Sequence, residues 1–233
     1  MQLTVRDASE LLNLPEKKIY SMIKRNEIPF YRLNKSYLFN RAELLEWAIS
    51  RSIHISPDFF SQPDDDNQQL PLLADAIEKG GIHHLETTIT KEDVLRTVVK
   101  LIPKLAQSKS DLIFTALMAR ETLGSTAIGD GIAIPHVRNP IILNINEPSI
   151  LLCFLKDPLD FGALDGKKVT TIFTMISPTA RIHLHLLARL SFILQNTEIR
   201  AVLSRDHSPA QILSKIRKAE SEIDLHPVGA KAV

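Results

Sequence analysis

Apolar residues recur at helical spacing in two stretches within the first 25 residues of the chain. Thr4 to Asp7 (TVRD) has the form of a capping box that opens a first helix, and Pro15 can occupy the first turn of a second one. Asn26 tolerates the left-handed conformation in which helices often end. The pattern predicts two helices joined by a very short turn. The positions expected to face inward are Ala8, Leu11, Leu12, Ile19, Met22 and Ile23.

The next segment alternates apolar and polar positions, in the sequence IPFYRLNKSYLFN at residues 28–40. Asn34, Lys35 and Ser36 interrupt the alternation, which is typical of a β-hairpin or wing. A second capping box at residues 40–43 (NRAE) predicts a third helix. The residues that this helix is expected to bury are Leu44, Leu45 and Trp47.

Beyond residue 70, helical patterns alternate with short apolar runs rich in β-branched residues. Runs of this kind suit strands that are buried on both faces, and their interleaving with helices predicts an α/β layered domain. The expected helices cover residues 74–79, 91–105, 110–123, 181–195 and 208–219. Gly80 and Gly81 are expected to end the first of them. The expected strands cover residues 128–134, 148–155 and 168–176.

Composition places the chain among globular proteins, with 44% apolar and 24% charged residues. A length of 233 residues predicts two domains.

The N-terminus carries Asp7 and Glu10 where a signal peptide needs apolar residues, so a cytoplasmic protein is expected. The net charge of +1 gives no global field, and any nucleic-acid binding must be local. Cys153, the only cysteine, lies in an apolar run and is expected to be a buried small hydrophobe.

The two domains are expected to meet at a linker over residues 54–72, which combines three prolines with the run Asp64 to Asp66. The acidic run could bind a cation, but solvated linker charge is favoured. The expected organisation is a helix-turn-helix domain, the linker, an α/β domain and a C-terminal tail, at residues 1–53, 54–72, 73–222 and 223–233.

The outward face of the second helix and the hairpin offer cations for phosphates and polar groups for base edges. The segment from Leu3 to Trp47 resembles the excisionase-type winged helix-turn-helix, related to MerR-type heads. The resemblance implies DNA binding, and a protein-docking or dimerisation module is the alternative. The candidate DNA-binding residues are Lys17, Lys18, Tyr20, Ser21, Lys24, Arg25, Arg32 and Lys35.

Within the α/β domain, the stretch GDGIAIPH delivers one histidine, His136, to the end of an apolar run. Pro135 restricts its own backbone and extends Ile134, while Gly129 and Gly131 permit unusual dihedral angles in the preceding turn. Imidazole is a competent nucleophile near neutral pH, and an arginine neutralises a phosphoryl group well. No P-loop, GxSxG elbow or metal-ligand spacing occurs in the sequence, so neither a cofactor nor a metal is expected.

Two segments carry a second resemblance, ARETLGSTAIGDGIAIPHVRNP at residues 119–140 and SPTARIHLHLLARLSFIL at residues 177–194. They are similar to the EIIA domains of the bacterial phosphotransferase system, in the fructose, mannitol and nitrogen-related class. The resemblance spans roughly residues 85–220. It implies an α/β sandwich with a mixed sheet, and phosphoryl transfer from an HPr-type phosphohistidine protein.

Carried over residue by residue, the resemblance implies that His136 accepts the phosphoryl group, that Arg120 clamps it and that His183 hydrogen-bonds it. His185 lies on the other side of the helical stripe from His183, so only one of the two can easily reach the site, and helical periodicity does not choose between them. The family pattern selects His183. Ala127 departs from the glycine that is common in the family, and Arg138 adds a cation after the acceptor.

A DNA-binding-like head joined to a phosphoacceptor domain indicates a regulatory phosphocarrier, similar to nitrogen-regulatory EIIA proteins. Two alternatives stay open: a transcription factor whose EIIA-like domain senses without transferring phosphate, and the EIIA component of a sugar permease encoded elsewhere. The expected partners are an HPr-type protein, with DNA, an EIIB domain or a regulated protein as further candidates. A homodimer is possible.

Overall fold

A computed structural model of the chain contains two compact units, and the two are described separately. One unit spans residues 69–220, and residues 1–68 belong to the other. Lys35, Arg138 and all of the expected linker except residues 70–72 lie outside the described residues. The structure describes residues 2–33, 36–51, 53, 70–86, 90–103, 105, 107–137, 145–203 and 208–225.

Three helices form most of the N-terminal unit: α1 (Val5–Leu11), α2 (Glu16–Lys24) and α3 (Arg41–Ser50). Thr4 closes the predicted capping box with Asp7. Pro15 is the N-cap residue of α2 and not part of its first turn. Asn26 has a φ of 55° and ends α2 in the left-handed conformation, as predicted.

A small antiparallel sheet completes this unit, with β1 (Gln2–Leu3), β2 (Tyr31–Leu33) and β3 (Ser36–Asn40) in the order β1-β3-β2. β2 and β3 form the predicted hairpin. The prediction that Trp47 is buried was wrong, since its side chain is only half-buried. Its indole N–H donates to the carbonyl of Glu27 at 2.7 Å, which holds the polar end of the ring near the surface.

The second unit is built on a five-stranded mixed sheet, in the order β4-β7-β8-β6-β5. β7 and β8 are antiparallel, whereas β4 pairs with β7 and β6 pairs with β8 in parallel. No helix among the described residues is long and apolar enough to cross a membrane. The strands are β4 (Ile82–Leu85), β5 (Ala127–Gly129), β6 (Ile132–Ala133), β7 (Ser149–Leu159) and β8 (Val169–Ile176). The helices are α4 (Leu73–Gly80), α5 (Lys91–Lys100), α6 (Gln107–Thr122), α7 (Ala180–Ile193), α8 (Thr197–Leu203) and α9 (Pro209–Leu225).

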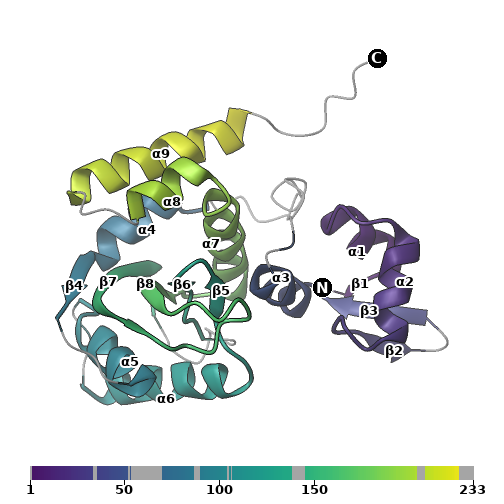
Figure 1. Cartoon of the computed structure of the whole chain (residues 1–233), viewed down its shortest axis with the longest axis horizontal. Helices are drawn as coiled ribbons and strands as arrows, with labels where there is room; N and C mark the ends of the chain where they lie inside the picture. The colour runs from purple at the N-terminus through teal and green to yellow at the C-terminus, as the bar shows by residue number, and fades with distance from the viewer. Residues whose placement is uncertain are drawn as a thin grey trace. The chain divides into compact units, whose positions relative to one another are not determined.

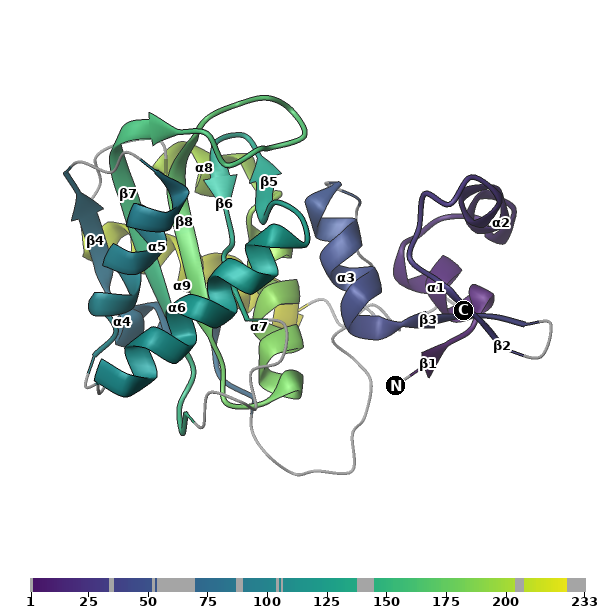
Figure 2. The same cartoon turned by 90° about the horizontal axis from the view of Figure 1, so that it is seen from below.

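Helices cover both faces of this sheet, with α5 and α6 on one face and α4, α7, α8 and α9 on the other (Figures 1 and 2). Alternate residues of the central strands supply the two cores. Leu151, Cys153 and Ile172 pack in the cluster formed with α5 and α6. The prediction of a layered α/β domain with a mixed sheet is therefore confirmed.

Several element ends are shifted from the prediction, since α5 ends at Lys100 and not at residue 105, β7 extends to Leu159 and α9 extends to Leu225. Two larger differences concern whole elements. The run IGDGIAI, predicted as one strand, is a hairpin in which β5 and β6 pair antiparallel around Asp130. Helix α8 was not predicted at all. Gly80 is the last residue of α4, where the helix was predicted to end. Only glycine fits there, because a Cβ would lie 2.2 Å from the carbonyl oxygen of Ile150 on β7.

Cys153 lies on β7 and is fully buried. Burial raises the pKa of its thiol to about 12, so the thiol stays protonated at neutral pH. The prediction of a buried small hydrophobe is confirmed.

A buried carboxylate caps the N-terminus of α4. Glu220 on α9 accepts hydrogen bonds from the backbone N–H groups of Leu73 and Ala74, at 2.6 and 2.9 Å. The same carboxylate lies 3.4 Å from the guanidinium of Arg189 on α7, and both side chains are buried. One acidic residue thus ties three helices together on one face of the sheet.

We expect Glu220→Gln to lower the free energy of unfolding by about 3 kcal/mol, because it removes the negative charge of the buried Glu220–Arg189 ion pair. The measurements are calorimetric unfolding of the full chain and hydrogen exchange at the Leu73 and Ala74 amides. Glu222→Gln, at an exposed position on the same helix, is the matched control. Equal melting of Glu220→Gln and the control would contradict this role.

Candidate functional site

The segment that carries His136 continues β6 along the edge of β8. The amide of Ile134 donates to the carbonyl of Thr126, and the amide of Met175 donates to the carbonyl of Pro135 at 2.9 Å. His136 forms a parallel bridge with Met175. Residues 134–136, called the acceptor arm below, are therefore held on both sides by backbone hydrogen bonds.

The turn before the acceptor arm uses the left-handed region at three successive residues. Gly129, Asp130 and Gly131 have φ values of 93°, 49° and 75°. A Cβ at Gly131 would lie 3.2 Å from the hydroxyl of Thr170, so space as well as conformation favours glycine there. The structure places the predicted loop residues where they set the path of the arm.

The imidazole of His136 has one ring nitrogen engaged by the backbone. Nδ1 lies 2.7 Å from the carbonyl oxygen of Ile134. A carbonyl only accepts hydrogen bonds, so Nδ1 carries the proton and Nε2 keeps its lone pair in the neutral ring. This is the tautomer that nucleophilic attack through Nε2 requires.

The structure separates the two candidate histidines of α7. The ring of His183 lies beside that of His136, with centroids 5.0 Å apart and planes tilted by 40°. Both residues are buried, with 3% of the surface of His183 and 4% of that of His136 exposed. His185 turns away, and its Nε2 lies 3.2 Å from the carbonyl oxygen of Pro71, just before α4. The histidine pair at the site is therefore His136 and His183.

Arg120 lies in the last turn of α6, beside the loop that leads into β5. Its guanidinium donates to the carbonyl of Gly124 at 3.0 Å. Two residues later, the carbonyl of Thr126 accepts the amide of Ile134 from the acceptor arm. Arg120 is thus fixed on the segment that flanks the arm, with its side chain half-buried.

Glu121 anchors the same loop, a role that the sequence analysis missed. It is buried and accepts from the hydroxyl of Thr126 at 2.6 Å and from the Thr126 amide. Lys91 at the start of α5 pairs with Glu121 at 2.9 Å and also donates to the carbonyl of Phe161. A charged residue inside an otherwise amphipathic helix gives no local sign of such a contact.

Asp130 at the tip of the turn was likewise missed. Its carboxylate pairs with Lys167 at 2.6 Å and with Arg200 of α8, and its amide donates to Asp165 at 2.8 Å. The hydrogen bond from Lys167 is the main cause of a lowered pKa at Asp130, followed after desolvation by the charge of Arg200. Partners 35 to 70 residues away could not be found from local sequence.

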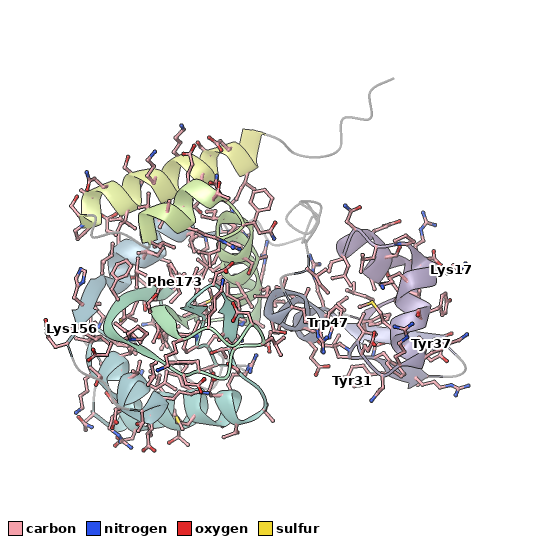
Figure 3. The ribbon with its side chains drawn as sticks, in the orientation of Figure 1. Lys17, Tyr31, Tyr37, Trp47, Lys156 and Phe173 are labelled. Carbon is pink, nitrogen blue, oxygen red and sulfur yellow. The ribbon has the colours of Figure 1, made fainter. Side chains whose placement is uncertain are left out.

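In the N-terminal unit, the candidate DNA-binding residues on α2 lie on its outer surface. Lys17 projects from the side of α2 that faces away from α1 (Figure 3). Tyr20 contacts the ring of Tyr37 edge-on at 6.2 Å, and Arg32 lies 6.0 Å from the centre of the same ring. The helix and the hairpin therefore present a continuous polar and aromatic surface. Lys17, Lys18, Tyr20, Lys24, Arg25 and Arg32 are exposed, and Ser21 is half-buried.

Fold and site together define an α/β domain with a histidine pair, preceded by a helix-turn-helix unit. Residues 76–219 match the family described as phosphoenolpyruvate-dependent sugar phosphotransferase system, EIIA 2, and the chain belongs to this family. Residues 3–52 match a helix-turn-helix domain.

Known proteins resemble the second unit. The nitrogen regulatory protein of Pseudomonas aeruginosa is 37% identical over 114 residues, which are 48% of this chain and 72% of that protein. A fructose-specific EIIABC component of Bacillus subtilis is 34% identical over 132 residues, 55% of this chain and 20% of that protein. Among solved structures, the nitrogen regulatory protein IIA-Ntr of Neisseria meningitidis matches 62% of this chain and 98% of its own, with 26% identity and a TM-score of 0.52.

We expect the pKa of the Asp130 carboxyl to lie below its ordinary value of 3.8. This pKa should rise in Lys167→Met, and it should rise further in the double variant that also carries Arg200→Met. Because the folded-state pKa is depressed, the stabilisation of the turn is present above pH 3.8 and is lost as the pH falls through the folded-state value. Carbon-detected NMR titration of the carboxyl measures the midpoint. Lys156→Met, which breaks an ion pair with Glu86, is the control and should leave Asp130 unchanged.

Proposed function

We propose that this protein is a regulatory phosphocarrier that accepts a phosphoryl group on Nε2 of His136 from an HPr-type phosphohistidine protein. The observation that carries the proposal is the 2.7 Å contact between Nδ1 of His136 and the Ile134 carbonyl, beside the ring of His183. The family to which the chain belongs and its similarity to nitrogen regulatory proteins support the regulatory form of this function.

The transfer itself needs no acid or base on the acceptor. The lone pair on Nε2 attacks phosphorus, the N–P bond of the donor phosphohistidine breaks, and its electron pair returns to the donor imidazole. The proton on Nδ1 of His136 stays in its hydrogen bond to Ile134 while positive charge develops on the ring. The carbonyl dipole of Ile134 stabilises that charge.

The phosphoryl oxygens carry nearly two negative charges, and two residues are assigned to them. His183 is the neighbour of His136 and acts as a hydrogen-bond donor to the transferred group. Arg120 supplies the fixed positive charge, held on its loop by Gly124 and through the Glu121 anchor. Because both are held before the donor arrives, little reorganisation is needed during transfer.

We expect His136→Gln to abolish acid-labile phosphorylation of the full chain by phosphoenolpyruvate, Enzyme I and an HPr-type carrier, because glutamine offers no nucleophilic nitrogen. Acid stability of the label and ³¹P NMR identify a phosphohistidine. His185→Gln is the matched control, since His185 faces Pro71, and it should keep the label. A label that survives in His136→Gln would place the acceptor elsewhere. A wild-type chain that accepts no phosphate would instead support a sensor domain without transfer.

The N-terminal unit is proposed to bind DNA through α2 and the hairpin. The exposed cations on α2 suit phosphate contacts, and the aromatic contacts between Tyr20, Tyr37 and Arg32 hold helix and hairpin as one surface. Phosphorylation of His136 would change the charge of the chain by about −2, and we propose that this change alters the affinity for DNA or for a regulated protein.

We expect Lys17→Ala and Lys18→Ala each to weaken DNA binding by the full chain and to reduce the slope of log affinity against log salt by about 1, because each removes one phosphate contact. Fluorescence anisotropy at several salt concentrations gives the slope. Arg6→Ala is the matched control, because Arg6 is an exposed cation on α1 that pairs with Glu10. Binding that does not depend on salt would contradict a DNA-binding role.

A further inference from the structure

Two buried hydroxyl groups, one near the end of β8 and one just after it, have no hydrogen-bond partner within the part of the chain that the structure describes. They belong to Thr174 and Ser177, whose side chains are 0% and 1% exposed. A buried hydroxyl without a partner costs free energy, so each calls for an explanation.

The two hydroxyls lie on opposite faces of the sheet. Ile172 and Ile176 pack in the core formed with α5 and α6, and Thr174 lies between them on the same face. Ser177 precedes Pro178, which favours extended backbone, so the alternation of β8 continues through it. Ser177 therefore shares the other face with Met175.

That other face is the face of His136. His136 bridges Met175 in parallel, and residues opposite each other in neighbouring strands point to the same side. Ala133 and Val137 belong to the α5 and α6 core, which also places His136 on the opposite face. Ser177 is thus the next residue on this face of β8 beyond the one that pairs with His136.

The acceptor arm and β8 run in the same direction past the His136 ring. Nδ1 contacts the carbonyl of Ile134, two residues back along the acceptor arm. Because the arm and β8 are parallel, forward along the arm is the direction from Met175 to Ser177.

Helix α7 begins just after Ser177, and its dipole adds a positive electrostatic potential there. Thr179 caps it, and no acidic residue occurs in its first turn. His183 is the fourth residue of the helix, so the N-terminal end of α7 lies at the histidine pair. The positive end of the helix dipole favours a negative group at this place.

We propose that Ser177 is a phosphoryl-binding residue, whose Oγ donates a hydrogen bond to an oxygen of the phosphoryl group on Nε2 of His136. The inference rests on the proposed phosphocarrier function and adds a residue that neither periodicity nor motif indicated. The hydroxyl has no partner among the described residues of the unphosphorylated protein, and it would gain one when His136 is phosphorylated.

The test compares the equilibrium of transfer from a phosphorylated HPr-type carrier to the wild-type chain and to Ser177→Ala. We expect the equilibrium constant to fall about tenfold or more in Ser177→Ala, the effect of losing a hydrogen bond to a charged acceptor. Thermal unfolding of the unphosphorylated variant should be unchanged or raised, because a buried hydroxyl without a partner has been removed. Ser177→Thr keeps a hydroxyl and should restore most of the equilibrium constant.

Thr174→Val is the matched control, since it removes a buried hydroxyl without a partner from the opposite face of the same strand. It should leave the transfer equilibrium unchanged. An equilibrium constant for Ser177→Ala within twofold of wild type, or an equal fall in Thr174→Val, would overturn the inference. If the wild-type chain accepts no phosphoryl group, the proposed function fails instead.

Discussion

The site depends on the parallel pairing of the acceptor arm with β8. The hydrogen bond from the Met175 amide to the Pro135 carbonyl sets this pairing, and with it the face on which His136 emerges. A shift by one residue would turn the imidazole into the core that contains Ala133 and Val137. The left-handed turn at residues 129–131 brings the chain into this register. The glycines and the proline of GDGIAIPH are therefore explained by strand pairing as much as by the histidine itself.

Local sequence predicted helix ends correctly where both partners of the capping interaction lie in one segment. The capping box at Thr4 and the end of α4 at Gly81 form as predicted, because each involves residues within a few positions of one another. The hairpin within IGDGIAI was not predicted, although Gly129, Asp130 and Gly131 are turn residues, because the two strands that they join are only three and two residues long. Trp47 was predicted to be buried on helical spacing alone, yet its N–H is drawn to a carbonyl 20 residues away.

In the site, too, contacts between residues that are distant in sequence could not be predicted. Helical spacing places His183 and His185 on different sides of α7, and only tertiary structure shows that one faces His136 and the other faces Pro71. Glu121 and Asp130 hold the two loops beside the acceptor arm, through Lys91 and through Lys167 and Arg200. Their partners are distant in sequence, so neither residue differs from a solvated charge until the fold is known.

The hydroxyls of Thr174 and Ser177 are both buried without a hydrogen-bond partner among the described residues, but their surroundings differ. The hydroxyl of Thr174 faces an apolar core, where only another polar side chain could satisfy it. By strand alternation Ser177 lies on the face of the sheet that carries His136, just before the positive end of α7, where an anion would satisfy its hydroxyl. A phosphoryl group bound there would be held by β8, the acceptor arm and α7 together. Phosphorylation would then act on the rigid elements of the domain as well as on its charge, which would give the proposed phosphocarrier two physical ways to report its state.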